Sequence, residues 1–296
     1  MSRPDFATKT HSTSYEYISP TKLDLTGRNV IITGTAWEDG VGHASALAFA
    51  RAGASCIALL DSHDISAASI EKIEAAASDA GRDTPLVIPF SVDISDLAAI
   101  QTTSQRLMEA FDGRLDVLVN NAAHQEPYGT ILDSDPNTDW RTWEVNIHGL
   151  MNMTRAFLPS LLHSRRQHGG LAINVNVASS GALSARGGSA NYRSSKLAIL
   201  RWTEILQMDN EQDGLLALCV NPGAIRTRMT VHEPEKVRAM LPHKPDIAGD
   251  TIVWLASDRK EWLAGRYVSC PWDMEELCNR KDEIVEGDKL KMKMVF

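Results

Sequence analysis

The stretch NVIITGTAWEDGVGHASALAFARA, residues 29–52, contains a strand pattern, a glycine-rich turn and a helical pattern in direct succession. Val30–Thr33 is apolar without interruption up to its threonine. Continuous rather than alternating apolarity is typical of a strand covered on both faces, as in a parallel sheet. The stretch therefore predicts the first βα unit of a sheet that helices cover.

The same alternation of short apolar runs and longer amphipathic stretches continues along the chain. Strand patterns lie at 30–33, 56–60, 86–92, 117–120, 171–177, 215–220 and, more weakly, 266–268. Helical patterns lie near 41–52, 66–80, 96–111, 139–163, 191–208 and 246–256. Strands regularly separated by helices indicate right-handed βαβ units. We therefore expect an α/β protein with a Rossmann-type, doubly wound, seven-stranded parallel sheet and helices on both faces.

The chain shows no internal repeat and no low-complexity linker, which favours a single domain over residues 23–275. Residues 1–22 predict a polar N-terminal arm that forms little core. Segment 226–245 has mixed polarity and several prolines, and it predicts a lid-like insertion. A C-terminal extension follows at 276–296. Its last apolar residues alternate with lysines, which suits either an edge strand or a solvated tail.

Charge and cysteine usage exclude several classes of protein. The chain has 296 residues and a formal net charge of −8, so it lacks the basic footprint of a nucleic-acid or anionic-membrane binder. No apolar run is long enough to span a bilayer, and the first 20 residues contain no apolar signal segment. The four cysteines include no Cys-x-x-Cys pair. We expect a reduced, soluble, cytoplasmic protein without a metal site.

Tyr192 and Lys196 stand four residues apart in the helical pattern 191–208, and Ser179 follows the strand pattern 171–177. Residues at i and i+4 project from one face of a helix. A serine that ends a strand meets this face only where strand and helix pack side by side. The spacing alone occurs often on ordinary helix surfaces, so its meaning depends on the rest of the chain.

The turn after the first strand pattern contains Gly34, Gly40 and Gly42. Glycines between a strand and a helix allow close approach of a pyrophosphate, whose charge the helix N-terminus favours. Asp61 ends the second strand pattern, where a carboxylate can accept hydrogen bonds from both ribose hydroxyls and repels a 2′-phosphate. These features predict a dinucleotide site that favours NAD over NADP.

Asp93 closes the third strand pattern and could accept a hydrogen bond from an adenine amino group. The neighbouring Ser95 could equally cap the following helix, and the two roles are compatible.

Together these motifs resemble the short-chain dehydrogenase/reductase family over residues 25–270, and in particular fungal members with extended N- and C-terminal segments. The family's glycine motif is matched with two extra residues, and its Asn-Asn-Ala-Gly motif is matched at 120–123 with alanine in the last place. Its Asn-Val-x-Gly motif is matched at 146–149, and its Pro-Gly-x-x-x-Thr motif at 222–227. Ser179 rather than Ser180 has the family's usual spacing to the tyrosine.

The resemblance implies the roles of individual residues. It assigns catalysis to Asn146, Ser179, Tyr192 and Lys196. It assigns cofactor binding to Gly34, Gly40, Val41, Gly42, Asp61, Asp93, Ile94, Asn120, Asn121, Ala122, Tyr192, Lys196, Pro222, Gly223, Ile225 and Thr227. It also implies a homodimer or homotetramer.

The implied reaction transfers a hydride between NAD(P) and a small-molecule secondary alcohol or ketone. Tyr192 acts as the general acid or base, and its pKa falls because the Lys196 ammonium and the oxidised nicotinamide favour the phenolate. Ser179 orients the substrate oxygen, and Asn146 holds a water that connects Lys196 to solvent.

Three departures from the family pattern carry expectations of their own. The longer glycine loop places Trp37, Glu38 and Asp39 near the phosphates, and we expect it to bulge outward because two carboxylates there are unfavourable. Ala123 narrows the space beside the adenosine. Trp272 replaces a glycine-rich segment and is expected near a substrate pocket or a subunit contact.

Two other interpretations remain open. One keeps the fold and the cofactor but performs net non-redox chemistry, such as epimerisation or cyclisation. The other is a nucleotide-binding scaffold without turnover, against which the complete set of four catalytic residue types argues.

Overall fold

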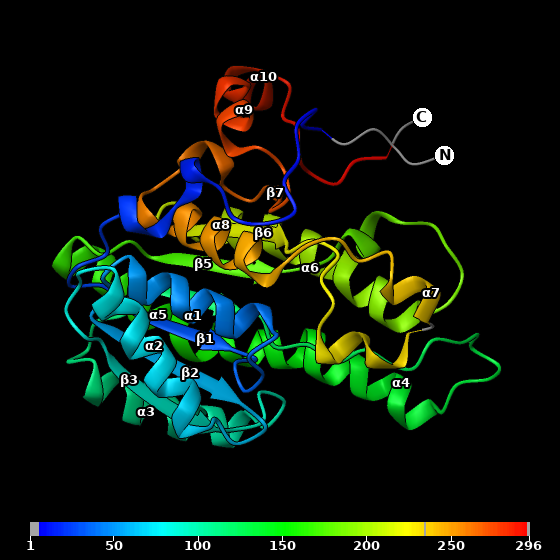
Figure 1. Ribbon diagram of the computed structural model, residues 1–296, viewed down its shortest axis with the longest axis horizontal. Helices are drawn as coiled ribbons and strands as arrows, with labels where there is room; N and C mark the ends of the chain where they lie inside the picture. Colours follow the sequence, from blue (N-terminus) through cyan, green and yellow to red (C-terminus); the bar gives the residue numbers. More distant parts are fainter. Residues whose placement is uncertain (1–5, 234, 295–296) are drawn as a thin grey trace.

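The computed structural model describes residues 6–233 and 235–294, and it contains a parallel sheet between two layers of helices (Figure 1). The strands are in the order β3-β2-β1-β4-β5-β6-β7, and every neighbouring pair is parallel. Their bounds are β1 (Asn29–Thr33), β2 (Cys56–Asp61), β3 (Leu86–Ser91), β4 (Val117–Asn120), β5 (Ile173–Val177), β6 (Leu216–Asn221) and β7 (Tyr267–Ser269). The predicted seven-stranded, doubly wound sheet is confirmed.

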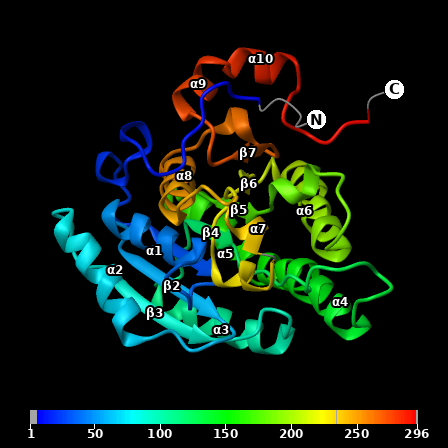
Figure 2. The same cartoon turned by 45° about the vertical axis from the view of Figure 1, so that its right-hand side comes forward.

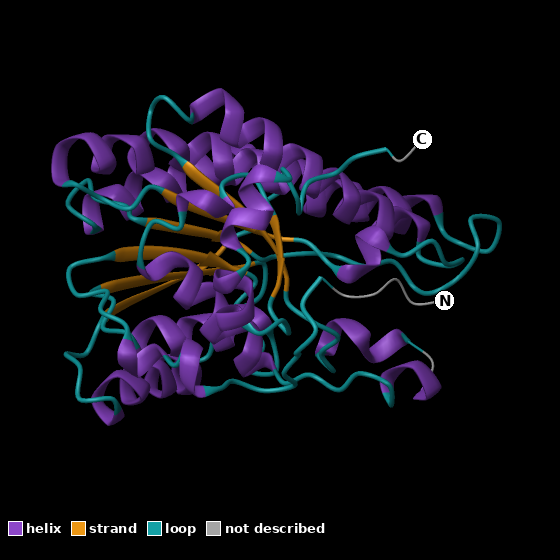
Figure 3. Ribbon diagram, turned by 90° about the horizontal axis from the view of Figure 1, so that it is seen from above, coloured by secondary structure: helices purple, strands orange, loops and turns teal. Residues whose placement is uncertain are grey.

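Helices cover both faces of the sheet, as Figure 3 shows from above. The α-helices are α1 (Val41–Arg51), α2 (Ala67–Asp79), α3 (Leu97–Ala110), α4 (Pro136–Trp143), α5 (Leu150–His168), α6 (Ala190–Asn210), α7 (Glu235–Arg238), α8 (Pro245–Ser257), α9 (Met274–Asn279) and α10 (Lys281–Glu286). The shorter helical turns are η1 (Glu16–Ile18), η2 (Pro20–Lys22), η3 (Glu144–Gly149), η4 (Ser180–Leu183), η5 (Arg228–His232) and η6 (Glu261–Leu263). Contacts join α1 to α2 and α8 in one layer, and α3 to α5 in the other.

Burial explains the continuous apolarity of the central strands. In β1, Val30 and Ile32 belong to the core beneath α1 and α8, whereas Ile31 belongs to the opposite core with Phe157 of α5. Because successive side chains of a strand point to opposite faces, a strand covered on both sides needs an apolar residue at every position. All five residues of β1 are buried accordingly.

The strand order reverses beside β1, which lies between β2 and β4. In open α/β sheets, ligands bind in the crevice outside the carboxyl ends of the strands at such a reversal. The loops that follow β1, β2, β4, β5 and β6 therefore meet at one edge, and this edge carries the sequence motifs.

The predicted helix at 139–163 is two helices joined by a π-helical turn. α4 ends at Trp143, the turn η3 follows, and α5 begins at Leu150. Single π turns inside helices are frequent at functional sites. Here the turn contains Asn146, one of the predicted catalytic residues.

The N-terminal arm is less polar in its packing than the sequence predicts. From residue 6 it runs beside α8 and α9, in blue in Figures 1 and 2. Ile18 is fully buried, and the Thr8 and Lys9 amides donate hydrogen bonds to the Glu276 carboxylate at 2.9–3.0 Å. His11 also donates its backbone N–H to the Pro271 carbonyl. The expectation of little core was wrong because the apolar partners of the arm come from the far end of the chain.

The C-terminal segment is neither of the two structures expected for it. Residues 288–294 form no strand, but Leu290 and Met292 pack against the buried hydrophobic residues of the fold. The Leu290 carbonyl accepts a bond from the Tyr267 amide, and the Met292 amide donates to Glu204. The short helices α9 and α10, which precede this segment, were not predicted. No helix of the described chain is long and apolar enough to cross a membrane.

Asp116 links the amino ends of three strands, and its replacement tests the energetics of this junction. Its fully buried carboxylate accepts hydrogen bonds from Asn29 and Leu171 amides and pairs with Arg28 and Arg114. Asp116→Asn removes the charge and leaves the two guanidinium groups without it. We expect the free energy of unfolding to fall by about 3 kcal/mol in urea titrations.

The matched control is Asp213→Asn, which breaks an exposed pair with Arg166 and should change stability by less than about 1 kcal/mol. Equal losses in both variants would contradict the assigned role of Asp116.

Candidate active site

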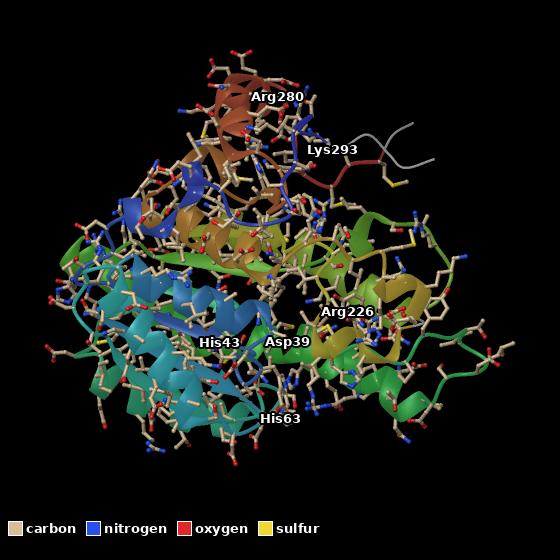
Figure 4. The ribbon with its side chains drawn as sticks, in the orientation of Figure 1. Asp39, His43, His63, Arg226, Arg280 and Lys293 are labelled. Carbon is tan, nitrogen blue, oxygen red and sulfur yellow. The ribbon has the colours of Figure 1, made fainter. Side chains whose placement is uncertain are left out.

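A cleft of about 550 Å³ opens at the carboxyl edge of the sheet. Its lining runs from Asp61 and Asp93, beside β2 and β3, to Ser179 and Tyr192, beside β5 and α6. Figure 4 shows Asp39 and His63 on the side of the first two strands, with Arg226 on the neighbouring segment 226–245. The cleft is in the size range of small-molecule and cofactor pockets.

The structure brings Ser179, Tyr192 and Lys196 together at one end of this cleft. Tyr192 lies in the first turn of α6, and Lys196 lies one turn later with its Nζ 5.8 Å from the tyrosine ring centroid. Lys196 is 2 % exposed and donates a hydrogen bond of 2.8 Å to the carbonyl of Val177, the last residue of β5. This bond joins the helix to the strand that leads to Ser179.

Burial is the largest influence on the pKa of both Tyr192 and Lys196. Burial raises the pKa of Tyr192, and a hydrogen bond with the Ser179 side chain opposes this effect. Burial lowers the pKa of Lys196 to about 8, so the ammonium persists at neutral pH. The predicted fall in the pKa of Tyr192 is therefore not achieved by the protein alone, because desolvation of the phenolate outweighs the positive charges near it.

Ser179 and Ser180 both line the cleft, but their environments differ. Ser179 is half-buried, accepts a bond from the Gly181 amide at 3.0 Å and lies close enough to Tyr192 for its side chain to lower the pKa of the phenol. Ser180 is exposed at the start of η4, and its amide is bound by the Asn221 side chain. Ser179, which lies beside Tyr192, is therefore also the serine that the sequence spacing favours.

Asn146 lies behind the cleft and is not among the residues that line it. Its side chain is 1 % exposed, accepts from the His124 amide at 2.8 Å, and donates to the His124 carbonyl at 2.9 Å. It also donates to the Ser195 hydroxyl, which in turn donates to the Tyr192 carbonyl. These bonds tie the loop after β4 to the first turn of α6.

The glycine-rich turn is shaped by close backbone packing. A Cβ on Gly42 would lie 2.1 Å from the Gly34 carbonyl oxygen, and Gly34 itself has φ +75°. The Asn121 side chain donates to the carbonyls of Thr33 and Gly34, which holds the turn against the end of β4. Gly40 is the N-cap of α1 and supplies no side-chain cap, so the first amides of the helix are left for an anion. This end of the cleft fits a pyrophosphate.

Asp61 and Asp93 line the cleft, and both already accept hydrogen bonds from the protein. Asp61 accepts from the Ala36 and His63 amides at 2.9 and 3.0 Å. Each carboxylate oxygen has further lone pairs, so a ribose hydroxyl can still bind there.

The Asp93 carboxylate accepts from the amide and hydroxyl of Ser95 and pairs with Arg141 at 2.5 Å. The expectation that Ser95 caps α3 was wrong, because Asp96 is the N-cap and accepts from the Ala99 amide.

The remaining predicted cofactor residues divide into two groups. Among the described residues, Gly42 and Asn120 do not line the cleft; Asn120 is buried and donates to the Asn176 side chain. The others contribute to the lining, namely Gly34, Gly40, Val41, Ile94, Asn121, Ala122, Pro222, Gly223, Ile225 and Thr227.

The longer glycine loop turns only partly outward. Glu38 forms an ion pair of 2.5 Å with Lys72 on α2, away from the cleft, as expected. Trp37 and Asp39 line the cleft instead, which corrects the expectation for these two residues. The Arg228 guanidinium lies 3.8 Å from the Trp37 ring centroid, so the indole joins the loop to segment 226–245.

Trp272 does not line the cleft, so the expectation that it lies near a substrate pocket was wrong. It is 5 % exposed and packs against Phe6 of the N-terminal arm and Tyr267 of β7. Its role is to bury the arm rather than to face a substrate. Ala123 lines the cleft, as its motif position suggests.

Several residues at the site carry no motif and were missed. Glu126 binds the N-terminus of α6, Arg141 pairs with Asp93, and Arg228 stacks on Trp37. Each contacts a partner more than 45 residues away along the chain, so no local spacing reveals it. His124 lines the cleft, and burial lowers its pKa.

Comparisons with known proteins agree with this geometry. The model of the short chain dehydrogenase family matches residues 28–238. The chain belongs to the short-chain dehydrogenase/reductase family. A short chain dehydrogenase, mpl6, from the fungus Monascus purpureus is 41% identical over 97% of this chain and 96% of its own length.

Two solved structures share the fold. One is a 3-ketoacyl-(acyl-carrier-protein) reductase from Brucella melitensis complexed with NADH, with a TM-score of 0.71 and 25% identity over 83% of this chain and 97% of that one. The other is a short chain dehydrogenase from Burkholderia cenocepacia in complex with NADP, with a TM-score of 0.68 and 25% identity over 83% and 96%.

The buried Lys196 predicts a pH dependence of stability. A free lysine titrates near pH 10.4, so between about pH 8 and 10 the unfolded chain binds more protons at this residue than the folded protein. Stability contributed by Lys196 therefore rises with pH across this window. Relative to Lys196→Met, we expect the wild-type free energy of unfolding to rise by up to about 1.4 kcal/mol per pH unit.

Urea unfolding of both proteins at several pH values in this window provides the measurement. Lys22→Met, at a half-exposed lysine, is the control and should show no such slope against wild type. A constant difference between wild type and Lys196→Met would contradict the depressed pKa.

Proposed function

We propose that this protein is an NAD(P)-dependent oxidoreductase that interconverts a secondary alcohol and a ketone, with Tyr192 as general acid or base. The observation that carries the proposal is the grouping of Ser179, Tyr192 and Lys196 at one end of the cleft, with an uncapped helix N-terminus and Asp61 towards the other. A scaffold that only bound nucleotide would gain nothing from a buried lysine beside a half-buried tyrosine.

Each residue has a distinct part in the proposed chemistry. Ser179 donates to the substrate oxygen and orients it towards Tyr192. Tyr192 removes the hydroxyl proton in oxidation and returns it in reduction. Lys196, held by Val177, supplies a positive charge beside the phenol. The nicotinamide cofactor, when bound, supplies the hydride acceptor or donor and, when oxidised, a further positive charge near Tyr192.

Asn146 is proposed to act at a distance from the substrate. Its side chain donates to the His124 carbonyl and the Ser195 hydroxyl and accepts from the His124 amide, so we assign it the task of fixing the loop after β4 against α6. A water that connects Lys196 to solvent could bind this side chain only at the second lone pair of its oxygen, because both of its N–H groups are already used.

We further propose that the cytoplasmic protein forms a homodimer or homotetramer through α6. The helix exposes Leu197, Ile205 and Met208, of which Met208 is 70% exposed. Apolar side chains along one helix are typical of a subunit contact.

The reaction class is tested by incubating the protein with NAD⁺ or NADH and a panel of secondary alcohols and ketones, followed by nicotinamide absorbance. We expect turnover by wild type and a loss of about 10²- to 10⁴-fold in kcat for Tyr192→Phe. Tyr17→Phe, at a tyrosine packed on α8, is the control and should retain wild-type kcat. Unchanged turnover by Tyr192→Phe would show the assigned mechanism to be wrong.

The proposed preference for NAD is tested by fluorescence titration. Because the Asp61 carboxylate repels a 2′-phosphate, NADH should bind about tenfold more tightly than NADPH, a difference of roughly 1.4 kcal/mol. Asp61→Asn should narrow this difference, while Asp64→Asn, at an exposed neighbouring carboxylate, should leave it unchanged. Tighter binding of NADPH by wild type would refute the preference.

A further inference from the structure

Glu126 is a buried carboxylate in the loop between β4 and α4, and its side chain points at the helix that carries Tyr192. The residue is 3% exposed. Its carboxylate accepts hydrogen bonds from the Asn191 amide at 3.0 Å and from the Tyr192 amide at 3.1 Å. It also accepts from the Thr142 hydroxyl at 3.0 Å. Glu126 therefore contacts the backbone of Tyr192 itself.

The helix α6 has no cap of its own at this end. Its N-cap residue, Ser189, has left-handed backbone angles (φ 51°, ψ 51°) and makes no side-chain capping bond. The Ser189 hydroxyl is buried and has no hydrogen-bond partner within the described part of the chain. The capping that a local side chain normally supplies, worth about 1 kcal/mol, comes instead from Glu126 on another segment. A negative charge there is also favoured by the helix dipole.

The loop that carries Glu126 is itself fixed from behind. Asn146 binds both the amide and the carbonyl of His124, two residues before Glu126. Thr142 bridges the Glu126 carboxylate and the His124 ring, whose Nδ1 lies 3.1 Å from the hydroxyl. The Trp143 indole N–H adds a bond of 2.9 Å to the Asn191 side chain. The π turn, α4 and the loop after β4 thus converge on the first turn of α6.

We propose that Glu126 is a positioning residue, which holds the first turn of α6 so that the Tyr192 hydroxyl faces Ser179 and the substrate. This inference rests on the proposed role of Tyr192. A displacement of the helix start moves the tyrosine directly, and misplacement of a reacting group by about 1 Å can cost roughly 10²-fold in rate.

The same carboxylate also influences the proton affinity of Tyr192. The groups that face the phenol are Lys196 and Arg193 on α6, His124 and Glu126 on the loop after β4, and Glu233 on segment 226–245. The negative charges of Glu126 and Glu233 raise the pKa of Tyr192, and the Arg193 guanidinium lowers it. Removal of the Glu126 charge therefore eases formation of the phenolate.

The decisive experiment compares Glu126→Gln and Glu126→Ala with wild type in alcohol oxidation. Glu126→Gln keeps the size and one acceptor oxygen for the α6 amides, so kcat should fall less than tenfold. Glu126→Ala removes every bond, and kcat should fall about 10²-fold with KM for the cofactor within about threefold. In both variants the midpoint of the kcat–pH profile should move to lower pH, because a negative charge that raises the pKa of Tyr192 is removed.

Glu261→Gln, at an exposed glutamate, is the matched control and should change neither kcat nor the profile. Thermal unfolding of each variant shows whether it is folded. If Glu126→Ala does not fold, the pH profile of Glu126→Gln alone tests the role of Glu126. A lower Tm with an unchanged midpoint and wild-type kcat for Glu126→Gln would mean that Glu126 only stabilises the fold.

The outcome is separable from the test of the proposed function. If wild type shows no turnover and Tyr192→Phe behaves identically, the proposed function fails. If wild type turns over and depends on Tyr192 while both Glu126 variants match wild type, only the role of Glu126 is overturned.

Discussion

The parallel direction of all seven strands is the constraint on which the rest of the structure depends. It places every strand's carboxyl end at the same edge, and the position of β1 between β2 and β4 opens a crevice there. Residues that are more than a hundred positions apart in the chain, such as Asp61 and Ser179, therefore line one cleft. The strand β1, whose end forms part of this edge, is buried on both faces of the sheet.

Burial has opposite effects on the two titratable groups at the centre of the site. It favours neutral forms, so the pKa of Tyr192 rises while that of Lys196 falls to about 8. The Val177 carbonyl offsets part of the cost of the buried ammonium. A tyrosine that stays protonated in the protein alone needs additional positive charge before it can act as a base, and this couples the proposed chemistry to an oxidised cofactor.

The order of strands and helices could be predicted because each element has a local cause. Continuous apolarity marks the buried strands, and the turn at Gly34 and Gly42 marks the first βα junction. Ser179, Tyr192 and Lys196 could be found for the same reason, since their spacing lies within one βα unit. The packing of the arm on Trp272 could not be found this way, because Phe6 and Trp272 lie at opposite ends of the chain. The alternation of apolar residues and lysines at the C-terminus did not predict the structure either, because Leu290 lies in an irregular segment with φ 63° rather than in a strand.

The sequence by itself determined the fold class, the family and the residue types at the reacting end of the cleft. These depend on hydrophobic periodicity and on short motifs, and both reflect the local geometry of the backbone. Only the tertiary structure decided the environment of those residues. The Asn146 side chain hydrogen-bonds the His124 backbone, Asp93 pairs with Arg141, and Glu126 caps α6. The physical reason is that a buried polar group must find a partner wherever packing brings one, and no spacing along the chain specifies that partner.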